Sequence, residues 1–279
     1  MSTTIRSVVS AIASTAAYHN ATSHEPSYEI EFVNNCPVRT HIHLSEIYGN
    51  LASIDAQRVE FDMGSDILSS AIEPGQLGIV EGTVDKTSNK STWRAWWDPV
   101  PNNTGSQVQT LVENTCQKDG DGLICFTNVS VIDGLTSSVQ VDFPSQPDMQ
   151  SIYVKPPQDW VCPTNNQIGA YPDELHLQSI DKIDYLEAHQ ACMSNCSLKV
   201  YAPERLPEVS WEAACCTRNH NTSDTCEDQS PALKEAAPEA YSFAYDDGTP
   251  YNKSGSTVTP LRVGGFRARE TVLKITLCP

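Results

Sequence analysis

The chain has 279 residues, with 18 basic against 35 acidic side chains, a formal net charge of -17 and a pI near 4.6. Such a surface repels the phosphates of nucleic acids and of anionic lipids, which argues against nucleic-acid binding and electrostatic membrane docking. A hydrophobic content of 39% excludes a disordered chain, and no apolar run approaches the roughly 18 residues of a membrane span. The composition predicts a soluble protein of one large domain or two small ones.

The first 27 residues differ in character from the rest of the chain. They hold one basic residue, Arg6, a short apolar stretch interrupted by serines, and small residues around Ala17. Two interpretations stay open: residues 1–27 are the remnant of a signal peptide, or they are a disordered tail. In either case the fold begins after them.

From residue 28 onward, apolar and polar residues alternate in short runs separated by turn-forming residues. Asn34-Asn35 ends the first run, and Pro74-Gly75 precedes the third. A period of two with frequent turns is typical of antiparallel strands, so we predict an all-β sandwich or barrel. The predicted strands lie at residues 28–33, 40–44, 76–80, 137–143 and 271–277.

The middle of the chain has a different pattern, because the alternation fades there and six of the ten cysteines fall within it. One amphipathic helix is predicted at residues 181–193, where apolar side chains recur on one helical stripe. We therefore predict a β-sandwich formed by residues 28–160 and 238–279. A disulfide-rich lobe with a short helix, residues 161–237, is inserted between the two parts.

The ten cysteines are an even number spread over the whole chain, which favours complete disulfide pairing in an oxidising compartment. A zinc site is the alternative that the spacing of Cys192 and Cys196 suggests. No second such pair follows, and the adjacent Cys215 and Cys216 suit two separate bridges, so we expect no metal and no cofactor. Seven Asn-x-Ser/Thr triplets agree with a secreted glycoprotein, and they begin at Asn20, Asn89, Asn102, Asn128, Asn195, Asn221 and Asn252.

The usual catalytic motifs of serine hydrolases, zinc proteases and nucleotide-binding proteins do not occur in the sequence. His41 and His43 alternate on one predicted strand, but without a third ligand we interpret them as a solvent-facing pair rather than a metal site. Trp96 could stack on a sugar ring, although tryptophans on a strand usually belong to the core. Asp246 and Asp247 by themselves are typical of a solvated turn.

Several motifs, in order along the chain, resemble those of thaumatin-like proteins. Cys215-Cys216-Thr217 resembles the family's Cys-Cys-Thr, and Leu277-Cys278-Pro279 resembles its Phe-Cys-Pro. Residues 237–247 resemble its Cys-Pro-Asp-Ala-Tyr-Ser-Tyr-Ala-Tyr-Asp-Asp segment. Further matches lie at residues 31–36, 110–113, 129–134, 172–175 and 191–196. The resemblance covers roughly residues 28–279 and implies a thaumatin-like β-sandwich with an inserted disulfide-rich lobe.

The resemblance also implies how the cysteines pair. Larger members of the family have cysteines where this chain has Tyr171 and Ala237, so Cys162 and Cys192 have lost their usual partners and are expected to pair with each other. One further pair has no counterpart in the family and would close a local hairpin. The expected bridges are Cys36 with Cys278, Cys116 with Cys125, Cys162 with Cys192, Cys196 with Cys215, and Cys216 with Cys226.

The family further implies an acidic groove between the two lobes. The residues that match its arginine, its glutamate and two of its aspartates are Arg94, Glu113, Asp133 and either Asp246 or Asp247. The remaining aspartate falls on Asn128, the acceptor of a glycosylation triplet, so a charge is lost where a glycan is allowed. Clustered carboxylates attract a cationic partner or act on a glycosidic bond, with one kept protonated by its neighbour's charge. Structural ion pairs at the lobe boundary are the alternative.

The expected function is that of a secreted, monomeric defence or cell-wall-related protein that binds β-1,3-glucan, a polysaccharide, in this groove. Its binding residues would be Arg94, Trp96, Asn128 and Asp246. One alternative is a weak endo-β-1,3-glucanase that uses Glu113 with Asp133 or Asp247. The other is a secreted factor that binds a protein receptor and has no carbohydrate activity.

Overall fold

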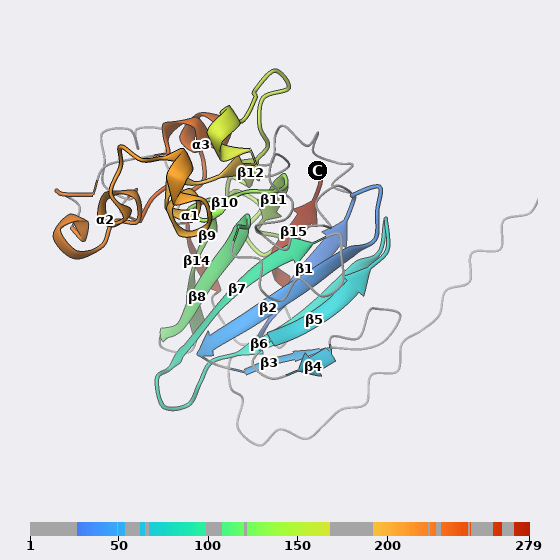
Figure 1. Cartoon of the computed structure of the whole chain (residues 1–279). Coiled ribbons are helices and arrows are strands. Elements are labelled where there is room, and N and C mark those ends of the chain that lie inside the picture. Colours follow the sequence, from blue (N-terminus) through green and yellow to red (C-terminus); the bar gives the residue numbers. More distant parts are fainter. Residues whose placement is uncertain are drawn as a thin grey trace, which may run out of the picture.

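β-Strands dominate the structure, and the helices are few and short (Figure 1). This confirms the prediction of an all-β fold. The computed structural model describes residues 27–48, 50–53, 62–64, 67–98, 108–119, 122–167, 192–222, 224–226, 230–244, 246, 259–263 and 271–279.

One sheet has six strands in the order β12-β11-β15-β1-β6-β3. At its centre the first strand pairs in parallel with the last, so the two ends of the fold lie side by side. The other strand pairs of this sheet are antiparallel. Its strands are β1 (Ser27–Asn34), β3 (Asn50–Ser53), β6 (Leu77–Thr83), β11 (Val139–Asp142), β12 (Ile152–Val154) and β15 (Thr271–Leu277).

The second sheet has seven strands in the order β14-β9-β8-β7-β2-β5-β4, and neighbouring strands run antiparallel. It carries the residues of functional interest. Its strands are β2 (Thr40–Tyr48), β4 (Asp62–Gly64), β5 (Ile67–Ile72), β7 (Lys90–Asp98), β8 (Leu111–Asp119), β9 (Gly122–Ser130) and β14 (Thr259–Val263).

The apolar core lies between the two sheets, because alternate residues of both contribute to one cluster of buried side chains. Tyr28 and Trp93 are among its largest members, and their polar atoms are paired within the core. Tyr28 Oη lies 2.6 Å from Ser91 Oγ and accepts a hydrogen bond of 3.0 Å from Trp93 Nε1. Gly82 makes room for this network, since a Cβ atom there would come within 2.2 Å of the Tyr28 ring.

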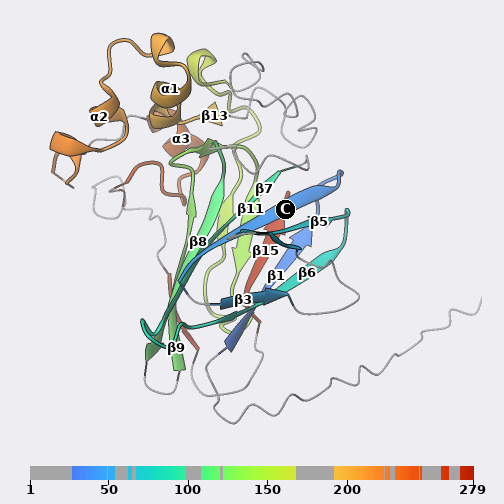
Figure 2. The same ribbon diagram turned by 60° about the horizontal axis from the view of Figure 1, so that its bottom comes forward.

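Three short helices gather at one end of the strands in both views (Figures 1 and 2). They are α1 (Asn195–Tyr201), α2 (Trp211–Ala214) and α3 (Pro231–Ala236). Serines begin two of them: Ser194 Oγ accepts a hydrogen bond from the Ser197 N–H at α1, and Ser210 Oγ accepts one from Ala213 at α2. We call this part of the chain, the described residues from 192 to 246, the helical lobe.

A two-stranded sheet joins the helical lobe to the sandwich. It pairs β10 (Gly134–Leu135) with β13 (Cys192–Met193). The helix predicted at residues 181–193 is therefore wrong at its end, where pairing with β10 draws the chain into a strand. The rest of that predicted helix, up to residue 191, lies outside the described residues. The predicted lobe boundaries at residues 161 and 237 stay predictions.

Five disulfides connect all ten cysteines. The pairs are those that the resemblance to thaumatin-like proteins led us to expect: Cys36 with Cys278, Cys116 with Cys125, Cys162 with Cys192, Cys196 with Cys215, and Cys216 with Cys226. The first ties the end of β1 to the residue after β15, and the second links β8 to β9 across the sheet.

Candidate functional site

Three of the predicted site residues lie in one row across the seven-stranded sheet. Arg94 on β7 is directly opposite Glu113 on β8, and Glu113 is directly opposite Asn128 on β9. Neighbours along these strands, such as Val112 and Val129, are buried in the core. The alternation of a strand therefore puts all three on the outer face of the sandwich. The Asn128 side-chain amide donates a hydrogen bond of 3.1 Å to Glu113 Oε2.

Asp133 approaches this row from the chain that follows β9. Its backbone carbonyl accepts hydrogen bonds from Ser197 Oγ at 2.6 Å and from the Ser194 backbone N–H at 3.5 Å. The next residue, Gly134, has a φ of +151°, and a Cβ atom there would lie 2.6 Å from the Cys192 carbonyl oxygen. Only glycine fits so close an approach. Gly134 and the start of α1 thus hold Asp133 where the sheet meets the helical lobe.

The charges of Glu113 and Arg94 both act on Asp133, which places its carboxyl near the row. Burial in the first place, and then the negative charge of Glu113, raise the pKa of Asp133 to about 6, while Arg94 acts in the opposite direction. This carboxyl therefore takes up or releases a proton in mildly acidic solution. Below, the four residues Arg94, Glu113, Asn128 and Asp133 are called the charged cluster.

Tyr201, the last residue of α1, is a neighbour of the charged cluster that sequence reasoning missed. Burial, and next the negative charge of Asp133, raise the pKa of its phenol, so the phenol keeps its proton in neutral solution. The motif that begins at Cys192 could have directed attention to this segment. The sequence, however, suggested a helix before that motif rather than after it, and α1 was not predicted.

Trp96 and His43 are buried, which corrects two expectations. They are opposite each other on β7 and β2, and their rings stack with centroids 5.5 Å apart at an interplanar angle of 21°. His43 is 2% exposed, so it does not face solvent as predicted; burial, followed by the charge of His41, lowers its pKa to about 4. Because His43 covers the Trp96 ring, Trp96 does not present an open face to a sugar. It lies instead beneath Arg94, whose guanidinium carbon is 5.9 Å from the ring centroid.

Asp246 does not belong to the charged cluster either. Its side chain is completely buried, and its Oδ2 lies 2.7 Å from Lys234 Nζ on α3 and accepts a 3.0 Å hydrogen bond from the Ser242 backbone N–H. The charge of Lys234 compensates for burying the carboxylate. The predicted solvated turn is therefore wrong at Asp246, which is not presented to a ligand. Asp247 lies outside the described residues.

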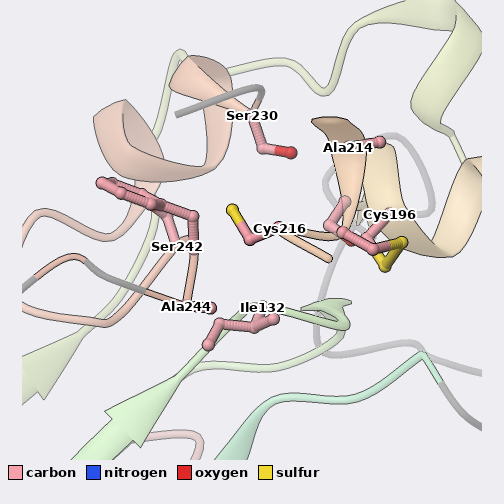
Figure 3. Close-up of a pocket in the computed structure, with 10 residues that line it drawn as sticks. Ile132, Cys196, Ala214, Cys216, Ser230, Ser242 and Ala244 are labelled. Carbon is pink, nitrogen blue, oxygen red and sulfur yellow. A yellow bond between two sulfur atoms is a disulfide. The ribbon is translucent and has the colours of Figure 1, made fainter. Parts of the chain in front are cut away.

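A small cavity lies between the helical lobe and the chain that follows β9 (Figure 3). Ile132, Ser230, Ser242 and the Cys196 disulfide are among the groups that line it, and its volume is about 30 Å³. That volume holds about one or two water molecules. It is far too small for a sugar ring, so this cavity is not a carbohydrate site.

The glycosylation triplets fall in unlike surroundings. Asn89, with a φ of +55°, is exposed in the turn between β6 and β7, and Asn221 is also exposed. Asn128 and Asn195 are half-buried, and Asn195 Oδ1 accepts a hydrogen bond of 2.9 Å from the Asn166 amide. The other three, Asn20, Asn102 and Asn252, lie outside the described residues.

A β-sandwich with a disulfide-linked helical lobe at one end is the class of protein that the fold defines. The chain belongs to the thaumatin family, whose sequence model matches residues 101–259, more than half of its length. The matched segment includes Glu113, Asn128 and Asp133, whereas Arg94 precedes it. No curated protein matches the chain closely enough to add to this assignment.

Two searches of the described part of the chain complete the description of the site. None of its helices is long and apolar enough to cross a membrane. Within the same residues, no three side chains of the metal-ligating types come together in a group that could hold an ion.

Proposed function

We propose that this thaumatin-family protein is secreted and binds β-1,3-glucan at the charged cluster. Its role would be in host defence or in a process related to the cell wall. The supporting observation is that Arg94 and Glu113 are paired on the outer face of the sheet, and that the charges of both act on Asp133, which comes from a third segment. Glucan hydroxyls can donate hydrogen bonds to the carboxylates and accept them from the guanidinium. Five disulfides support an oxidising, extracellular location.

The mixed charge of the cluster favours a neutral polysaccharide over a strongly charged partner. A cationic protein would be attracted by the net charge of -17 but repelled locally by Arg94, and an anionic ligand would be repelled by the protein as a whole. A neutral polymer of hydroxyl groups meets neither difficulty. An extended polymer can also contact the outer face of several strands at once, whereas a compact ligand would contact only part of it.

Binding to insoluble β-1,3-glucan tests this proposal. Wild type should sediment with the polysaccharide, and Glu113→Gln should weaken the affinity about tenfold, because a charged hydrogen bond contributes about 1.5–3 kcal/mol. Glu81→Gln is the matched control, since Glu81 lies on β6 in the other sheet and its substitution changes the net charge equally. Equal binding by both variants would locate the site elsewhere. Failure of the wild type to sediment would favour the protein-receptor alternative.

A weak glucanase is the second candidate, and the raised pKa of Asp133 is the observation that favours it. A carboxyl with a pKa of about 6 can protonate a glycosidic oxygen, with Glu113 serving as the nucleophile or the base. A reducing-sugar assay on the sedimented samples separates the two functions. Release of sugar that falls as the pH rises above 6, and that both Asp133→Asn and Glu113→Gln abolish, would support hydrolysis. Binding without release would leave the protein a lectin-like binder.

A further inference from the structure

Phe126 and Asn128 lie on the outer face of β9, one strand repeat apart. Thr127 between them is buried, and side chains two residues apart on a strand project from the same side, about 7 Å apart. Phe126 is opposite Thr115 on β8 and Pro260 on β14. It is 37% exposed, which makes it one of the few exposed large apolar side chains among the described residues. Phe126 is not part of the charged cluster, and the proposed glucan binding does not use its ring.

Asn128 begins a glycosylation triplet, so the exposed ring stands two residues before a candidate sugar acceptor in Phe126-Thr127-Asn128-Val129-Ser130. A sugar joined to Asn128 would leave the strand on the face that carries the ring. One face of N-acetylglucosamine consists largely of C–H groups, which pack on an aromatic ring through dispersion and the removal of apolar surface from water. The first sugar folded back along β9 would therefore meet Phe126.

We propose that Phe126 is the packing partner of an N-linked glycan on Asn128. On transfer, Nδ2 of Asn128 bonds to C1 of the first N-acetylglucosamine, the bond from C1 to the lipid-linked pyrophosphate donor breaks, and one amide proton is lost. Nδ2 keeps one hydrogen, which can still be donated to Glu113 Oε2. Ser130 is buried and its Oγ accepts a hydrogen bond from the Ile132 N–H at 3.4 Å, so transfer precedes the folding of β9.

The proposal goes beyond glucan binding and does not depend on it, since it requires only passage through a glycosylating secretory pathway. In the folded protein β9 holds the ring beside the glycan, whereas in the unfolded chain the ring and the glycan are not held together. The contact therefore stabilises the native state. It also turns the first sugar along β9 toward Phe126, away from Asp133.

The test uses the whole chain from a glycosylating host, with its glycans trimmed enzymatically to a single N-acetylglucosamine. Wild type should melt several degrees above Asn128→Gln. In a Phe126→Leu background, which keeps an apolar side chain but removes the flat ring, this difference should shrink by at least half. In NMR spectra, the ring protons of the sugar on Asn128 should be shifted upfield by the aromatic ring current, and Phe126→Leu should remove the shift.

Asn89 supplies the matched control, because its triplet lies in an exposed turn and Thr87 is two residues before it. The effect of Asn89→Gln on the melting temperature should be the same with Phe126 or Leu at position 126. The proposal would be overturned if peptide mapping found Asn128 unmodified in the secreted protein. An Asn128→Gln effect that is equal in the two backgrounds, or a sugar without the upfield shift, would also overturn it.

Discussion

The helical lobe and the charged cluster each contain a largely buried aspartate, and the two differ in what compensates for the buried charge. Asp246 in the helical lobe has a lysine at 2.7 Å and a backbone N–H donor. Asp133 has no such partner among the described residues: burial and the charge of Glu113 raise its pKa to about 6, against the opposing charge of Arg94. A cation beside a buried carboxylate compensates for its burial, whereas a carboxyl whose pKa is raised costs stability when it ionises. The comparison separates residues kept for structure from residues available for function.

The largest expected effect belongs to the structural side of this comparison, at the bridge between Cys36 and Cys278. It spans 242 residues, against 9 for Cys116 and Cys125, and the loop-entropy model gives about 5 kcal/mol for the first and about 2.5 kcal/mol for the second. Replacing both cysteines of each bridge by serine and measuring denaturant unfolding checks this ranking. Equal losses of stability would show that loop closure does not govern these bridges.

The ion pair of Asp246 should come next. Lys234→Met leaves a buried carboxylate without its cation and should lower the free energy of unfolding by about 3–5 kcal/mol. Adding Asp246→Asn should recover part of that loss, because no uncompensated charge is then buried. Glucan sedimentation of the folded fraction should not change. If Lys234→Met stayed folded but lost glucan binding, the ion pair of Lys234 and Asp246 would contribute to binding. The distinction between a structural Asp246 and a functional Asp133 would then be wrong.

The strands could be predicted because their signal is local. Apolar residues such as Ile30 and Phe32 alternate with polar ones, and the core takes up that alternate set. The motifs that resemble the thaumatin family single out Arg94, Glu113 and Asn128 as members of one site, although not as a row across three strands. The registers of β7, β8 and β9 then align these residues without any further signal.

The parts that could not be predicted depend on tertiary contacts. Asp246 is paired with a lysine 12 residues earlier, and nothing in either local sequence announces that pair. His43 follows the polar alternation of its strand, yet stacking on Trp96 buries it. Tyr201 joins the site only because α1 begins after the β13 pairing rather than before it. Alternation predicts the face of a strand but not what covers that face.

The pH dependence of stability in Asp133→Asn tests the other half of the comparison, the cost of ionising Asp133. A folded-state pKa of about 6, above the ordinary value of 3.8, means that ionisation costs stability as the pH rises from about 4 to 6, and the full cost remains above pH 6. The neutral amide avoids this cost. The variant should therefore be more stable than wild type at pH 7, by at most about 3 kcal/mol, and the gain should vanish near pH 4. A gain independent of pH would mean that ionisation of Asp133 is not its cause.

The smallest expected effect is at Asn128, where the charge that the family leads us to expect is missing and a glycan is allowed. Asn128→Gln and Asn128→Asp both remove the glycosylation site, and only the second restores a carboxylate beside Glu113. If the glycan partly covers the charged cluster, both variants from a glycosylating host should bind β-1,3-glucan more tightly than wild type. The gain should be only a few-fold, or about 1 kcal/mol, because a sugar packed on Phe126 leaves the side near Asp133 open. A gain confined to Asn128→Asp would identify the lost charge as the cause. No gain in either variant would mean that neither the glycan nor the missing charge limits binding at this face.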